Sequence, residues 1–133
     1  IEGSFKTLWL LHGLSGNHSS WMRQTSIERY AKEFGLAVVM PCADRSWYTD
    51  TAYGKKYFTF ITQELPAKMA HFFKGYSSAR EDNLVMGLSM GGYGALKIAL
   101  AESVYQKALA GEDERLGRIV GCLRIHAFIS YYN

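Results

Sequence analysis

The sequence has little of the chemistry that marks disulfide scaffolds, metal sites and membrane spans. Its two cysteines, Cys42 and Cys122, lie far apart, without CxxC spacing or nearby histidine pairs. This pattern predicts buried thiols in a reducing, cytoplasmic compartment, with a disulfide or a metal site as the lesser alternative. No apolar run approaches the roughly 18 residues that a membrane helix needs. The first residues also lack the pattern of a secretory signal peptide, so no membrane association is expected.

Clustered charge is scarce as well. The 133 residues carry 15 Lys and Arg against 12 Asp and Glu, and the basic side chains are scattered along the chain. This pattern is typical of a solvated surface and does not indicate a nucleic-acid partner. The chain is instead 48% hydrophobic and 14% aromatic, which suffices for a core. Because it has neither an internal repeat nor a low-complexity linker, we expect residues 1–133 to form one domain.

Short apolar runs alternate with segments of helical spacing. The predicted strands cover residues 5–11, 36–40 and 84–86, and the predicted helices cover residues 26–34, 57–73 and 91–101. Gly35 is the natural end of the first helix, and Pro66 should kink or break the second. Strands that alternate with helices imply a mostly parallel sheet covered on both faces.

A serine stands among small residues in the stretch N-L-V-M-G-L-S-M-G-G-Y-G-A-L, residues 83–96. Its centre, G-L-S-M-G at residues 87–91, is a G-x-S-x-G motif between a predicted strand and a predicted helix. In that context the motif predicts a nucleophile elbow, a turn so sharp that large neighbours would collide and the serine is strained. We interpret Ser89 as the nucleophile and the Met90 N–H as an oxyanion donor. A glycine-rich turn with an incidental serine is the alternative.

A second motif, L-L-H-G-L-S-G-N-H-S-S-W at residues 10–21, follows the first predicted strand. An α/β-hydrolase needs a second oxyanion N–H from a loop in this region. Gly13 would let the backbone approach the acyl carbon, and we expect the Leu14 N–H to be the donor, with Ser15 as the neighbouring alternative. A simple glycine turn is the other interpretation, but two such loops in the right order favour a two-part oxyanion hole.

Together with V-V-M-P at residues 38–41 and W-Y-T-D-T-A-Y-G at residues 47–54, these motifs resemble the esterase D family of α/β-hydrolases. The four blocks are most similar to tributyrin-esterase-like carboxylesterases, with S-formylglutathione hydrolases and mycolyltransferase-type acyltransferases as relatives. The resemblance implies a serine esterase that acts on short acyl esters, with Ser89 as its nucleophile and no metal or organic cofactor. It also implies that the aromatic block lies near the active site, where Trp47 would contact the substrate. Aromatic side chains packed on the sheet edge are the alternative.

The acid and the base that a serine nucleophile needs follow only from chain order. A base must accept the hydroxyl proton and a carboxylate must orient that base, and α/β-hydrolases place the acid and then the histidine after the serine. The chain has four histidines, at positions 12, 18, 71 and 126, and only the last follows Ser89. Chain order therefore predicts His126 as the base and Asp113 as the acid, with Glu112 or Glu114 as substitutes. A histidine packed in a sheet and a solvated acidic turn are the alternatives.

The chain after Ala101 does not match the family, whose C-terminal half is longer. We therefore expect a truncated or rearranged α/β-hydrolase. Because such a sheet leaves edges and apolar faces uncovered, we expect a homo-oligomer, with a small-molecule ester substrate as the other partner. Two further functions stay open: a non-catalytic α/β-hydrolase-like module with an incomplete triad, and an acyltransferase or thioesterase of the same family.

Overall fold

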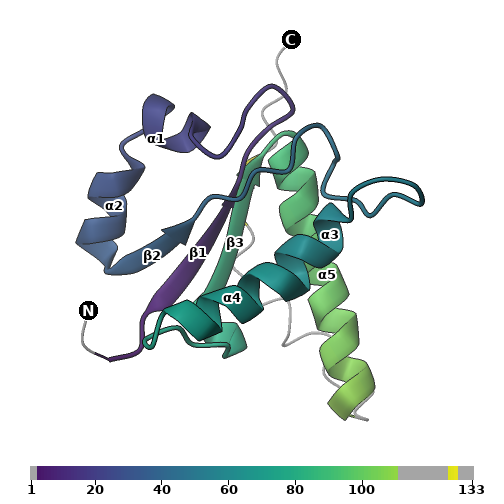
Figure 1. Ribbon diagram of the computed structural model, residues 1–133. Coiled ribbons are helices and arrows are strands. Elements are labelled where there is room, and N and C mark those ends of the chain that lie inside the picture. Colours follow the sequence, from purple (N-terminus) through teal and green to yellow (C-terminus); the bar gives the residue numbers. More distant parts are fainter. Residues whose placement is uncertain (1–2, 111–125, 129–133) are drawn as a thin grey trace.

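Four parallel strands form the sheet in the computed structural model, which describes residues 3–110 and 126–128 (Figure 1). The strands are β1 (Lys6–Leu11), β2 (Leu36–Val39), β3 (Asn83–Leu88) and β4 (His126–Phe128), in the order β2-β1-β3-β4. The helices and helical turns are α1 (Ser20–Gln24), α2 (Ile27–Phe34), α3 (Tyr57–Thr59), the π-helical η1 (Phe60–Glu64), α4 (Leu65–Phe72), the 3₁₀ turn η2 (Arg80–Asp82) and α5 (Met90–Ala110).

The chain reverses its direction across the sheet at β1. Strand β2 pairs with one side of β1 and β3 pairs with the other. Because crossovers between parallel strands are right-handed, the helices of these two connections must lie on opposite faces. Figure 1 shows this arrangement, with α1 and α2 on one face and α3, α4 and α5 on the other. The predicted parallel sheet with helices on both faces is therefore confirmed.

The main core cluster lies between the sheet and α5. Trp9 and Leu11 of β1 and Val85 of β3 belong to this cluster, since alternate residues of a strand face the same side. They share it with Ala95 and Ala99 of α5, whose small side chains let the helix lie close to the sheet. Burial of these apolar groups holds β1, β3 and the first half of α5 together, and these elements carry the predicted site.

The helix predicted over residues 57–73 forms, with an irregular turn next to Pro66. Segments α3, η1 and α4 follow one another without a break, but η1 is π-helical. Pro66 stands at the start of α4. It has no N–H, and in a regular helix its ring would press on the carbonyl of the residue four positions earlier. The wider π turn makes room for the ring, so the expected distortion is found at this point.

Two helices depart from the prediction, and one ends as predicted. Helix α1 forms at Ser20–Gln24, where no helix was expected, and α5 continues to Ala110 instead of ending near Ala101. The extension is consistent with the high helix propensity of the Ala, Leu, Lys and Gln residues in that segment. Helix α2 ends at Gly35, whose φ of 63° is left-handed and suits glycine.

The predictions about the cysteines and about membrane spans can be compared with the described residues. The sequence predicts a buried Cys42, but this residue, which follows β2, is only partly buried. Cys122 lies outside the described residues. In the part of the chain that the structure describes, no helix is long and apolar enough to cross a membrane.

An apolar stripe on α5 is left uncovered by the described residues. Tyr93, Leu96 and Leu100 follow one another at helical spacing, and all three are exposed. Surfaces of this kind are often buried by another chain or segment. The homo-oligomer stays a prediction, and this stripe is the surface that it would cover.

Candidate active site

The predicted elbow and the predicted oxyanion loop leave neighbouring strands at the same edge of the sheet. Leu11, the last residue of β1, stands opposite Gly87 near the end of β3. From there the chain continues into residues 12–14 on one strand and into Ser89 on the other. The chain direction reverses across the sheet at this point, and ligands of open parallel sheets bind at such a switch point. The tertiary structure thus brings the two motifs together.

Ser89 occupies a strained turn of the kind that the motif predicts. It separates β3 from α5, it is exposed, and its φ angle is 56°. This left-handed backbone costs a residue with a Cβ about 1–2 kcal/mol. The Ser89 carbonyl accepts a hydrogen bond from the Tyr93 N–H over 3.0 Å, which anchors the serine at the N-terminus of α5. Met90, the first residue of α5, is fully buried, so its predicted contribution would come from its backbone N–H.

Two glycines make room for this turn. A Cβ on Gly87 would lie 2.2 Å from the carbonyl carbon and oxygen of Gly91. A Cβ on Gly91 would lie 2.3 Å from the carbonyl oxygen of Leu11. Both distances are far below van der Waals contact and involve backbone atoms, which cannot rotate away. The glycines of the motif are therefore required by the close approach of α5 to β3 and β1.

The loop after β1 lies against the elbow at Gly13. A Cβ on Gly13 would be 3.4 Å from the Leu88 carbonyl oxygen and 3.7 Å from the Ser89 Cβ. The Gly16 N–H donates to the Gly13 carbonyl over 3.1 Å, which folds residues 13–16 into a tight turn. Leu14, the predicted donor, directly follows the point of contact with the elbow. Its role in an oxyanion hole stays a prediction.

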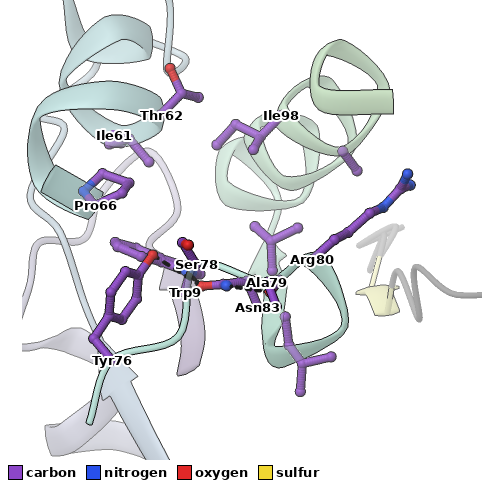
Figure 2. A pocket seen from close by; sticks show the side chains of 13 residues that line it. Trp9, Ile61, Thr62, Pro66, Tyr76, Ser78, Ala79, Arg80, Asn83 and Ile98 are labelled. Carbon is purple, nitrogen blue, oxygen red and sulfur yellow. Dashed lines mark hydrogen bonds between the residues drawn. The ribbon is translucent and has the colours of Figure 1, made fainter. Parts of the chain in front are cut away.

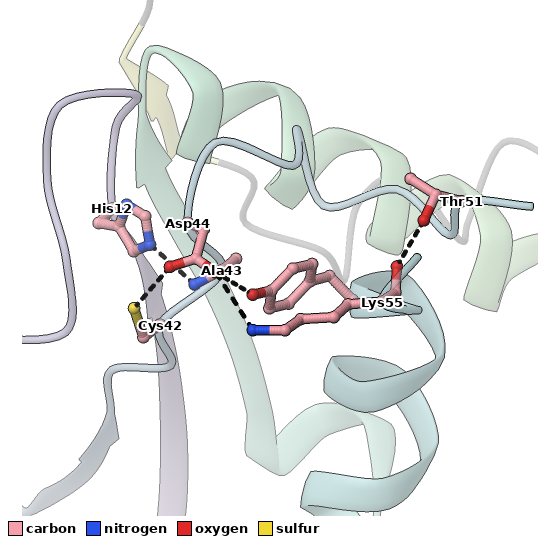
Figure 3. Close-up of polar contacts among 7 residues, drawn as sticks. His12, Cys42, Ala43, Asp44, Thr51 and Lys55 are labelled. Carbon is pink, nitrogen blue, oxygen red and sulfur yellow. Dashed lines mark hydrogen bonds and ion pairs between the residues drawn. The ribbon is translucent and has the colours of Figure 1, made fainter. Parts of the chain in front are cut away.

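His12 is a buried link whose partners the sequence did not reveal. The residue is only 1% exposed. Its Nε2 accepts a hydrogen bond from the Ala43 N–H over 2.9 Å, and its Nδ1 lies 2.7 Å from the Gly13 carbonyl oxygen. Figure 3 shows the ring beside the Ala43 amide. Because both ring nitrogens have partners, His12 is not placed to act as a base for Ser89.

Tyr48 joins the aromatic loop, residues 43–56, to His12. It is fully buried, and its hydroxyl donates to the His12 carbonyl over 2.8 Å. Its ring packs on α5 at Gly94, where a Cβ would come within 2.4 Å. Lys97 Nζ donates to the Tyr48 carbonyl over 3.3 Å. Burial raises the pKa of the Tyr48 phenol, so the hydroxyl stays protonated and can donate its hydrogen bond.

Trp47, the predicted substrate contact, stands at the surface beside α5. It is 45% exposed, and its ring meets the Tyr93 ring edge-on, with 5.7 Å between centroids and 79° between planes. Tyr93 follows Ser89 by four residues, so the aromatic pair lies about one helical turn from the serine. Sequence reasoning missed Tyr93, although its spacing from the motif serine was a usable signal. The substrate contact of Trp47 stays a prediction.

A polar clasp holds the base of the aromatic loop (Figure 3). The Tyr57 hydroxyl donates a hydrogen bond to Asp44 Oδ2, and Lys55 Nζ lies 3.7 Å from the same oxygen. The Tyr57 hydrogen bond, more than the Lys55 charge, holds the pKa of Asp44 below its usual value. Both charged groups are exposed, so the ion pair itself contributes little to stability. The clasp brings the start of the loop next to α3.

The predicted base and acid are described only in part. His126 is the first residue of β4 and stands opposite Met86 of β3. Strand β4 is thus the direct neighbour of β3, the strand that leads into the elbow. Asp113 and its substitutes Glu112 and Glu114 lie outside the described residues. The catalytic roles of His126 and Asp113 stay predictions.

A cavity of about 460 Å³ lies apart from the elbow, between α4 and α5 (Figure 2). Its polar wall is centred on Asn83, whose Oδ1 accepts hydrogen bonds from Trp9 Nε1 and the Tyr76 hydroxyl. The Asn83 Nδ2 donates to the carbonyls of Ser77 and Ala79. The predicted site residues do not line this cavity.

In residues 3–110 and 126–128, no three His, Cys, Asp or Glu side chains gather in a way that could hold a metal ion.

Comparison with known proteins decides the family. The family model described as "Putative esterase" matches residues 2–109, a range that includes the elbow and the loop after β1. The chain belongs to the Esterase family. The resemblance to esterase D-type hydrolases found in the sequence motifs is therefore confirmed.

Two curated relatives match most of the chain. An acetyl esterase of Caldicellulosiruptor saccharolyticus is 35% identical over 109 residues, which are 81% of this chain and 40% of that protein. An S-formylglutathione hydrolase of Paracoccus denitrificans is 29% identical over 74% of this chain and 42% of its own length. The chain thus spans well under half the length of these relatives.

Solved structures share the fold. FphF, a fluorophosphonate-binding serine hydrolase of Staphylococcus aureus, has a TM-score of 0.72 and 47% identity over 77% of this chain and 40% of its own. An S-formylglutathione hydrolase of Agrobacterium tumefaciens has a TM-score of 0.67 and 28% identity over 76% of this chain and 44% of its own. The predicted α/β-hydrolase fold is confirmed.

Proposed function

We propose that this chain acts as a serine carboxylesterase that hydrolyses short-chain acyl esters through an acyl intermediate on Ser89. The main support is the exposed Ser89, with its φ of 56°, at the N-terminus of α5 and beside the Gly13 turn. A nucleophile on an exposed turn beyond the end of the strand can reach a carbonyl carbon that a buried serine cannot. The relatives named acetyl esterase and S-formylglutathione hydrolase are consistent with an acyl substrate.

In the proposed reaction, Ser89 Oγ attacks the ester carbonyl carbon while His126, oriented by Asp113, takes the hydroxyl proton. The carbonyl electron pair moves onto its oxygen, and the N–H groups of Leu14 and Met90 stabilise the resulting oxyanion. One such donor typically contributes about 3 kcal/mol to transition-state stabilisation. The intermediate expels the alcohol, which leaves with the proton held by His126. Water then attacks the acyl group in the same way, releasing the acid and restoring the serine.

A fluorophosphonate probe tests the nucleophile directly. We expect the probe to label the wild-type chain and to leave Ser89→Ala unlabelled, and we expect only the wild type to hydrolyse p-nitrophenyl butyrate. Absence of labelling in a folded wild-type chain would favour the non-catalytic module. An increase in acyl transfer when an alcohol or thiol acceptor is added would favour the acyltransferase.

The base and acid are tested separately by the variants His126→Ala and Asp113→Asn. We expect both to lower the turnover of p-nitrophenyl butyrate by about 10³-fold or more, in line with the loss of triad members elsewhere. His71→Ala is the matched control, since His71 is on the exposed side of α4, where it packs against Phe72. Full activity in both variants would show that the base and the acid are wrongly assigned, whatever becomes of Ser89.

A further inference from the structure

The His12 ring has one tautomer that satisfies both of its neighbours. The Ala43 N–H can only donate, so Nε2 must carry the lone pair that accepts this 2.9 Å hydrogen bond. Nδ1 therefore carries the hydrogen and donates to the Gly13 carbonyl oxygen at 2.7 Å. At 1% exposure, the ring has almost no contact with water that could replace either partner. His12 is thus a neutral donor to the loop that contacts the elbow.

The Gly13 carbonyl belongs to the same peptide unit as the Leu14 N–H. Among residues 3–110 and 126–128 no peptide bond is cis, so this C=O and this N–H point in opposite directions across one rigid plane. A hydrogen bond that fixes the direction of the carbonyl therefore also fixes the direction of the amide. The Gly16 N–H binds the same carbonyl over 3.1 Å, but it comes from the loop itself. His12 adds an anchor from the end of β1.

Two hydrogen bonds hold His12 itself in position. The Ala43 amide holds the far side of the ring, and the Tyr48 hydroxyl holds the His12 carbonyl over 2.8 Å. Both partners belong to the segment after β2, which Lys97 of α5 also holds through the Tyr48 carbonyl and Thr49 Oγ1. The orientation of the amide after Gly13 thus depends on contacts with the segment after β2 and, through it, with α5.

We propose that His12 is a positioning residue that aims the Leu14 N–H at the oxyanion through the Gly13 carbonyl. The inference rests on the proposed esterase function, in which this N–H is a donor. His12 touches no substrate atom in this role and exchanges no proton. Its contribution is to keep one amide in the direction that the transition state needs, so that no reorganisation occurs during the reaction.

Two replacements separate the two sides of the ring. In His12→Asn, the side-chain amide nitrogen can reach the Nδ1 position and donate to Gly13, but the Ala43 N–H loses its acceptor. In His12→Gln, the longer amide can place its oxygen at the Nε2 position and accept from Ala43, but the Gly13 carbonyl loses its donor. A purely structural role predicts that activity follows stability in both variants. The positioning role predicts that activity and stability separate.

We expect His12→Gln to keep the higher Tm of the two variants but to lose about 10- to 100-fold in kcat for p-nitrophenyl butyrate, with KM changed by less than about threefold. We expect His12→Asn to have the lower Tm but to lose only about threefold or less in kcat. His71→Gln, on the exposed side of α4, is the control for a histidine change outside the site. A kcat that falls in step with Tm across both variants would overturn the proposal.

A readout that needs no catalysis keeps this inference separate from the proposed function. In the ¹⁵N NMR spectrum we expect the His12 ring to show a protonated Nδ1 and a bare Nε2. We also expect His12→Gln to shift the Leu14 amide resonance more than His12→Asn does. If both NMR results are obtained but the wild type shows neither labelling nor turnover, the esterase is refuted and the anchor stands. A bare Nδ1, or a Leu14 amide that does not respond to His12→Gln, would refute the anchor even in an active enzyme.

Discussion

Replacing Ser89 by glycine should stabilise the protein while abolishing its nucleophile. The φ of 56° at this residue is left-handed, and a side chain with a Cβ pays about 1–2 kcal/mol to adopt it. Glycine removes that cost, but its greater flexibility stabilises the unfolded chain by about 0.4–1 kcal/mol, which lowers the stability of the protein. The net expectation is that Ser89→Gly is more stable than Ser89→Ala by about 0.5–1 kcal/mol. For a domain of this size, this corresponds to roughly 2–5 °C in Tm.

Ser89→Ala is the matched control, because alanine keeps the Cβ and removes only an exposed hydroxyl. Urea unfolding and calorimetry of the wild type and the two variants measure the difference, and the fluorophosphonate probe checks that both variants have lost the nucleophile. If Ser89→Gly is no more stable than Ser89→Ala, the serine is not strained, and the explanation of the elbow is wrong. This outcome would not depend on whether the wild type is an active esterase.

Three other predictions follow from the contacts around the site and from the exposed stripe on α5. Tyr48→Phe should lower the free energy of unfolding by about 1–3 kcal/mol in urea titrations, because the buried His12 carbonyl loses its donor, whereas the same change at the fully exposed Tyr53 should have no effect. Trp47→Ala should raise KM for p-nitrophenyl butyrate more than it lowers kcat, and equal kinetics in mutant and wild type would remove Trp47 from the substrate site. Sedimentation velocity should show a homo-oligomer that Leu96→Lys weakens, and a monomeric wild type would contradict this expectation.

Patterns that repeat within a few residues were read correctly from the sequence. Three of the strands follow from short apolar runs, and α2 and the α3–α4 helix follow from helical spacing. The end of α2 follows from Gly35. The elbow could also be predicted, because the G-x-S-x-G motif and its flanking strand and helix are local in the chain. What the motif did not specify was how close the backbones come, which explains why Gly87 and Gly91 cannot carry a Cβ.

The buried contacts around the oxyanion loop could not be read in the same way. His12 belongs to the motif at residues 10–21 and Tyr48 to the aromatic block at residues 47–54, yet the Tyr48 hydroxyl binds the His12 carbonyl across 36 positions. The aromatic loop has no periodicity, so nothing in it distinguishes the buried Tyr48 from the exposed Tyr53. The partial exposure of Cys42 could not be predicted either, since cysteine is usually buried and tertiary packing decides the exposure of a single loop residue.

By itself, the sequence determined which segments are strands and helices, and which serine stands on a tight turn, because those properties depend on neighbours in the chain. Only the tertiary structure decided that β2 and β3 flank β1 from opposite sides, so that the turn at Ser89 and the turn at Gly13 meet at one edge of the sheet. It also decided that the His12 ring joins two loops, because a side chain with two ring nitrogens finds its partners through packing.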